Sequence, residues 1–181
     1  RALAHGDRTE AEALVASREA TEPSAVALQA RLLVHRGEYG DAETSLDTVA
    51  RNTPSSAAGL EFGLLLQRRG RVAEAQRFLD SVIDRGMRSV NAPDQFRGAL
   101  AARAVGGFRD ANRLFRLAAQ TAPDDPAIQT AWGELFLEKY NHSDALASFQ
   151  AALALDDQWA PAHLGVAQVL VAENPPVARA S

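Results

Sequence analysis

Residues that could carry out acid–base or metal chemistry are few in this 181-residue chain, and they lie far apart. The four histidines are His5, His35, His142 and His163. None has a second His, Asp or Glu three or four residues away in an arrangement suited to a metal; Glu138 is four residues from His142, but a predicted turn separates them. Zinc needs three or four convergent ligands. We therefore expect no metal site.

The remaining reactive residue types also have structural explanations. The acidic pairs Asp124–Asp125 and Asp156–Asp157 occupy predicted turns, where helix capping accounts for them. Gly106–Gly107 ends a predicted helix and is not followed by the lysine of a phosphate-binding loop. The chain has no cysteine, which removes disulfides and thiol catalysis. We expect no catalytic residues and no cofactor.

Composition excludes two further classes of partner. The net charge is −4, with acidic and basic residues interspersed, so there is no basic stripe for nucleic acid. No run of eighteen apolar residues is present, so we expect no membrane insertion. Lys139 is the only lysine among nineteen basic residues, a bias typical of GC-rich bacterial genomes. Because the chain starts at Arg1 rather than Met, we interpret it as a piece of a larger bacterial protein from which a targeting segment could have been removed. We expect it to be soluble, and the compartment, cytoplasmic or periplasmic, stays open.

A short pattern that returns five times predicts the architecture. In each copy a turn residue precedes an alanine by five positions: Gly6 and Ala11, Gly37 and Ala42, Gly70 and Ala75, Gly106 and Ala111, Tyr140 and Ala145. The alanines are 31, 33, 36 and 34 residues apart. A period in this range is typical of helical solenoids, whose repeats each contact only their neighbours.

Each period is predicted to form two helices. In residues 126–155, Asp125 is a plausible N-cap, and apolar residues then recur at spacings of three and four in two segments separated by Asn141 and His142. The same pattern predicts helices over 24–36 and 40–51, 57–69 and 72–84, and 93–105 and 108–121, with single helices over 8–20 and 161–173. Residues 85–92 form a long connection in this interpretation. The chain is therefore predicted to be all-α, with about ten helices.

The spacing of large and small residues resembles that of the tetratricopeptide repeat. Residues 126–159 carry the pattern as Trp132, Gly133, Phe136, Ala145, Phe149 and Ala152, and residues 92–125 as Gly98, Ala99, Gly106, Phe108, Ala111, Phe115, Ala118 and Pro123. The resemblance divides the chain into a partial repeat (1–22), four full repeats (23–55, 56–91, 92–125 and 126–159) and a partial repeat with a tail (160–181). It implies a right-handed α-solenoid of stacked antiparallel helix pairs that acts as a non-catalytic scaffold for a protein or peptide partner.

In this family, one face of the first helix of each pair lines a concave groove. The corresponding candidates here are Arg31, Leu60, Leu64, Arg68, Phe96, Leu100, Arg103, Glu134, Leu137 and Glu138, followed by Pro161, Leu164 and Gln168 in the last helix. The middle of this face is apolar, one flank is basic and the other acidic, so a peptide with an acidic and a basic end would be oriented by it. In the alternative interpretation, the leucines pack against neighbouring first helices and the charges are solvated. The residues of a carboxylate clamp are not matched.

Two other functions remain open at this stage. The last half-repeat is expected to expose Val166, Ala167 and Leu170, so the array could be a spacer or a module that forms a homodimer through this end. The array could also be the arm of an enzyme whose catalytic domain lies outside these residues.

Overall fold

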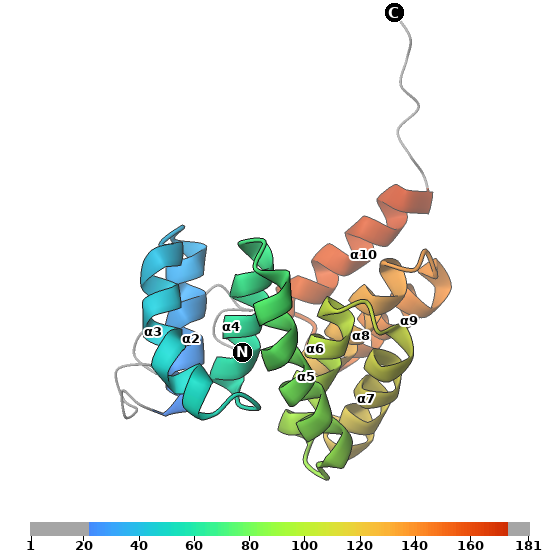
Figure 1. Cartoon of the computed structure of the whole chain (residues 1–181). Coiled ribbons are helices and arrows are strands. Elements are labelled where there is room, and N and C mark those ends of the chain that lie inside the picture. The colour runs from blue at the N-terminus through green and yellow to red at the C-terminus, as the bar shows by residue number, and fades with distance from the viewer. Residues whose placement is uncertain (1–21, 174–181) are drawn as a thin grey trace, which may run out of the picture.

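A computed structural model describes residues 22–173, and this part of the chain consists of nine α-helices without any strand. The helices are α2 (Pro23–His35), α3 (Tyr39–Asn52), α4 (Ala57–Arg68), α5 (Val72–Arg88), α6 (Ala92–Ala104), α7 (Phe108–Thr121), α8 (Pro126–Leu137), α9 (His142–Leu155) and α10 (Ala160–Glu173) (Figure 1). The predicted all-α solenoid is confirmed. The helix expected over 8–20 lies outside the described residues, and none of the described helices could cross a bilayer.

The predicted helix limits hold to within one residue, with one exception. Helix α5 continues to Arg88, so the long connection expected over 85–92 shrinks to Ser89, Val90 and Asn91. The physical reason is a close contact at Gly86. A Cβ added there would lie 2.9 Å from the Cα of Gly98 on α6. Packing against α6 thus stabilises a helical turn that a glycine would weaken in isolation.

Polar side chains fix where several helices begin. Ser56, Asn91, Asp125 and Asn141 are N-caps whose side chains accept hydrogen bonds from backbone N–H groups of the following first turn. These bonds satisfy donors that a helix start leaves unpaired. The cap expected at Asp125 is confirmed, with a 3.0 Å bond from the amide of Ala127.

Small residues let the two helices of a pair approach closely. The repeated alanines Ala42, Ala75, Ala111 and Ala145 are all at most 1% exposed. One helical turn after the last of them on α9, Phe149 fills the space left by two glycines. A Cβ on Gly133 of α8 would lie 2.7 Å from the Phe149 ring, and one on Gly165 of α10 would lie 2.4 Å from it. One aromatic ring therefore joins three helices from two successive pairs.

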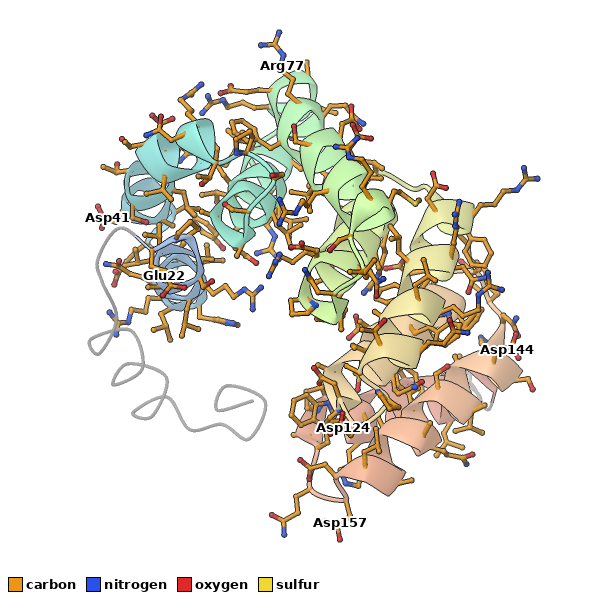
Figure 2. All side chains as sticks on the ribbon, turned by 90° about the horizontal axis from the view of Figure 1, so that it is seen from below. Glu22, Asp41, Arg77, Asp124, Asp144 and Asp157 are labelled. Atoms are coloured by element: carbon orange, nitrogen blue, oxygen red, sulfur yellow. The ribbon has the colours of Figure 1, made fainter. Side chains whose placement is uncertain are left out.

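The helix pairs stack along a curved path. The first helices α2, α4, α6, α8 and α10 contact one another in succession, whereas no comparable contact joins the second helices α3, α5, α7 and α9. We call the first set the inner helices and the second set the outer helices. In Figure 2, Arg77 on α5 and Asp144 on α9 lie on the outer edge of the curve. The exposed side of the inner helices, which we call the inner face, is therefore the concave side. The boundaries of the repeats themselves stay a prediction.

The turns within the helix pairs share a left-handed backbone residue. Gly37, Gly70 and Gly106 have φ values of 81°, 78° and 76°, and Tyr140 occupies the equivalent place with φ 58°. Glycine adopts this conformation freely, whereas a residue with a Cβ is strained by about 1–2 kcal/mol. The Tyr140 side chain is 86% exposed, so packing contributes little to offset the strain.

Replacing Tyr140 by glycine should stabilise the protein by about 1 kcal/mol, because the left-handed strain is relieved at the cost of some additional backbone entropy. Urea unfolding followed by circular dichroism measures the change. Tyr140→Ala, which keeps a Cβ, is the control and should show little gain. A glycine variant less stable than the wild type would show that the tyrosine ring makes stabilising contacts.

Candidate partner-binding groove

The structure places nine of the ten candidate residues on the inner helices and Glu138 at the C-cap of α8, and these residues differ in exposure. Arg31, Arg68 and Glu138 are exposed, and six others are partly buried: Leu64, Phe96, Leu100, Arg103, Glu134 and Leu137. Leu60 is an exception because it is 0% exposed and belongs to the core shared by α2–α6. Both flanks of α4 are covered by the neighbouring inner helices α2 and α6. At Leu60 the packing interpretation therefore holds, and this side chain does not line an open groove.

The apolar middle of the inner face is only partly open. Phe96 packs towards Phe115 of α7, with ring centroids 6.1 Å apart, and Leu64 and Leu100 both rest against the core. Gln67 donates a 2.8 Å hydrogen bond to the carbonyl of Ala104 and so ties α4 to the end of α6. These contacts cover part of the apolar middle of the inner face.

The inner face is hollowed near its C-terminal end. A hollow of about 400 Å³ lies between α6, α8 and α10, and we call it the C-terminal hollow. Its lining consists of Arg103, Glu134, Leu137, Glu138, Pro161, Leu164 and Gln168. All seven belong to the face selected from the sequence. The structure therefore brings together residues that are up to 65 positions apart in the chain.

An ion-pair cluster forms one wall of this hollow. The guanidinium of Arg103 on α6 lies 2.5 Å from a carboxylate oxygen of Glu134 on α8 and 2.7 Å from one of Glu138. Burial alone would lower the pKa of Arg103, but its hydrogen bonds to Glu138 and Glu134 outweigh that effect and raise the pKa. Arg103 is thus a permanent cation held between two carboxylates.

A second ion pair joins the inner helices near the N-terminal end. Arg31 on α2 lies 2.6 Å from Glu61 on α4. The expected basic flank is therefore partly neutralised, because Arg31 pairs with an acidic residue of the next inner helix and Arg103 pairs with the two carboxylates of the acidic flank. Glu61 was not identified from the sequence as the partner of Arg31. The signal was their separation of 30 residues, which is close to the repeat period. Arg103 and Glu134 form an ion pair at a similar separation of 31 residues.

A larger hollow lies away from the inner face. It has a volume of about 670 Å³ and is lined by Arg51, Pro54, Ala73, Glu74, Arg77, Phe78 and Ser81. Its walls come mainly from the outer helix α5, and Arg77 marks its place on the outer edge in Figure 2. The charges here also pair with one another, since Arg51 lies 2.8 Å from Asp47 and 3.1 Å from Glu74.

The histidines and carboxylates do not converge in the described part of the chain. Residues 22–173 contain no group of three His, Cys, Asp or Glu side chains that could hold a metal. His163 is exposed, and its Nε2 lies 2.7 Å from the carbonyl oxygen of Asp157. It therefore ties the start of α10 to the preceding turn.

Asp94, which sequence reasoning missed, anchors α6 and so positions Phe96, Leu100 and Arg103. Its buried carboxylate accepts hydrogen bonds of 2.5–3.2 Å from four side chains, those of Arg85, Ser89, Asn91 and Arg97. Burial would raise the pKa of Asp94, but these donors outweigh it and lower the pKa from 3.8 to about 2. The spacing Asn91-x-x-Asp94, repeated as Asn141-x-x-Asp144, is the sequence signal of this cap.

Comparisons with known proteins support the fold assignment. No family model matches this chain, and no curated protein matches its sequence. Among solved structures, TTC0263, a thermophilic TPR protein in Thermus thermophilus, is similar with a TM-score of 0.66 and 22% identity, over 83% of this chain and 82% of that one. A crystal structure of MamA protein gives 0.51 and 12% identity, over 84% and 83%. A tetratricopeptide repeat protein from Parabacteroides merdae ATCC 43184 gives 0.50 and 20%, over 81% and 58%. The described part of the chain therefore has the α-solenoid fold of these tetratricopeptide repeat proteins.

The anchor at Asp94 predicts a specific loss of stability in acid. Because the folded pKa of about 2 lies below the ordinary 3.8, the stabilisation is complete above pH 4 and is lost as the pH falls towards 2. Asp94→Asn should lower the free energy of unfolding by about 2 kcal/mol at pH 7. Urea unfolding at several pH values should show the difference between the two proteins vanishing near pH 2. A difference that stays constant down to pH 2 would contradict this role.

Proposed function

We propose that this chain is a non-catalytic scaffold that presents its concave inner face to a peptide or a segment of a partner protein. The observation that supports this most directly is the C-terminal hollow, which is shared by three successive inner helices. Concave surfaces built from several repeats suit an extended or helical partner segment, because each repeat adds contacts along its length.

The proposed contact surface keeps nine of the ten residues selected from the sequence and omits the buried Leu60. It comprises Arg31, Leu64, Arg68, Phe96, Leu100, Arg103, Glu134, Leu137 and Glu138. Leu164, which is 61% exposed on α10, adds the most accessible apolar group of the hollow. We expect burial of this side chain against a partner to make the main apolar contribution to the binding free energy at this end of the groove.

The electrostatic arrangement supports a binding role rather than catalysis. The carboxylate of Asp94, whose pKa is strongly lowered, accepts hydrogen bonds from four donors, and these bonds also fix the start of α6. Arg103 is likewise held in ion pairs across two helices. The pKa shifts of Asp94 and Arg103 both follow from contacts that fix the helices, so neither shift requires a role in proton transfer.

A second function is favoured by exposed apolar side chains in the C-terminal half of α10. Leu170 and Val171 are 50% and 63% exposed there, and Ala167 is also exposed. Val166, expected to be exposed as well, is partly buried against the last core cluster. The exposed apolar groups suit self-association through this end of the solenoid.

Self-association predicts a concentration-dependent increase in mass in analytical ultracentrifugation, which Leu170→Glu should abolish because a charge would be buried at the contact. Val90→Glu is the matched control, since Val90 is 88% exposed between α5 and α6. A wild-type chain that stays monomeric at high concentration would exclude this function.

The binding function predicts that Leu164→Gln weakens the partner's affinity by about 1 kcal/mol, or roughly fivefold in Kd. Selection of a random peptide library on the wild-type chain supplies binders, and fluorescence anisotropy of the synthetic peptides gives the affinities. Leu155→Gln is the control, because Leu155 is 43% exposed at the end of the outer helix α9. Equal affinities for the two variants would contradict binding at the inner face.

A further inference from the structure

We propose that the C-terminal hollow selects a partner segment in which a cationic side chain, Arg or Lys, stands beside an apolar one. This inference rests on the proposed function and specifies the chemistry of the partner. Three observations support it: the carboxylates of the hollow face the solvent, each has one oxygen without a hydrogen bond from the described residues, and apolar side chains lie beside them.

The charges of the ion-pair cluster are unequally exposed. The side chain of Arg103 is 22% exposed, whereas those of Glu134 and Glu138 are 41% and 49% exposed. One covered cation thus lies between two carboxylates that face the solvent. The cluster carries a net charge of one negative unit and presents its negative side to an incoming segment.

Each carboxylate keeps one oxygen available. Arg103 donates to Oε2 of Glu134 and to Oε1 of Glu138. The other oxygen of each side chain accepts no hydrogen bond from any residue in the range 22–173. A guanidinium or ammonium group of a partner can therefore bind here without displacing Arg103, and the bond is charge-assisted.

Apolar groups lie beside these carboxylates. Leu137, Pro161 and Leu164 line the same hollow, whose volume of about 400 Å³ admits more than one side chain. Arg and Lys carry long apolar stems below their charged ends, so they can cover a leucine while the charge reaches a carboxylate. An adjacent apolar residue of the partner would fill the remaining space.

The opposite end of the inner face has the reverse polarity. There the cation is the exposed member of the pair, since the Arg31 side chain is 47% exposed and that of Glu61 is 14% exposed. A basic segment is therefore disfavoured at α2–α4 and favoured at α8–α10. This contrast fixes the direction in which a charged segment lies along the groove.

The net charge of the two halves agrees with this direction. Residues 105–173 contain nine acidic and four basic side chains, a formal charge of −5. Residues 22–104 contain ten acidic and eleven basic side chains, a formal charge of +1. The field of the C-terminal half attracts cationic segments before contact, and added salt weakens this attraction.

The test uses peptides selected from a random library on the wild-type chain. We expect the selected sequences to be enriched in Arg or Lys next to Leu, Ile, Val or Phe. Synthetic copies with the basic residue replaced by Gln should bind about five- to tenfold more weakly, and high salt should reduce the affinity of the parent peptide. Selected sequences without basic enrichment would overturn the inference.

A matched pair of charge variants locates the effect. The double variant Glu134→Gln and Glu138→Gln should lower the affinity about fivefold to tenfold. The control, Asp110→Asn with Asp157→Asn, changes the net charge equally at exposed sites outside the hollow and should have little effect. Circular dichroism checks that each protein is folded, and the single variant Glu138→Gln, whose side chain is the more exposed, replaces the double variant if that one unfolds.

A charge exchange separates this inference from the proposed function. Glu138→Lys should weaken binding of the basic peptide. A peptide with Glu in place of its basic residue should bind this variant more tightly than it binds the wild type. If Leu164→Gln weakens binding but the charge variants do not, the inference fails and the proposed function stands. If the library yields no binder, or if neither set of variants weakens binding, the proposed function fails and the inference fails with it.

Discussion

Close approach between helices is the constraint on which the rest of this structure depends. At each crossing a glycine or alanine stands where a larger side chain would push the helices apart, as at Gly86 against Gly98 and at Gly133 against Phe149. Tight packing in turn excludes water from the alanines and aromatic rings of the core. The curve of inner helices, and with it the concave face, follows from repeating this contact along the chain.

The inner face then arises as a by-product of stacking. The inner helices lie close enough for side chains of one to bind those of the next, and Arg103 and Arg31 each do so. Surface ion pairs of this kind contribute little to folding stability, about 0–1 kcal/mol. Their greater effect is on the surface itself, because they decide which charges are covered and which remain exposed to a partner.

Much of the fold could be predicted from the sequence, since spacing of small and apolar residues is a local signal. The helix limits and the buried alanines follow from it. The extension of α5 could not be predicted in this way, because it depends on a contact between Gly86 and a helix further along the chain. For the candidate site, helical periodicity identified the correct face but could not show that neighbouring inner helices cover Leu60 or that Glu61 pairs with Arg31. Both depend on the distance between repeats, which no single helix encodes.

Helix α6 has a mechanical consequence for the whole array. Ala101 packs into the core cluster of the N-terminal half, whereas Ala99 and Ala102 pack into the next cluster. This one helix therefore couples two hydrophobic cores, and the four donors around Asp94 fasten its first turn. Bending the solenoid at α6 would disturb both cores at once, so this helix should act as a stiffening element, and the array should be more compliant between α7 and α8, where fewer contacts join successive helices.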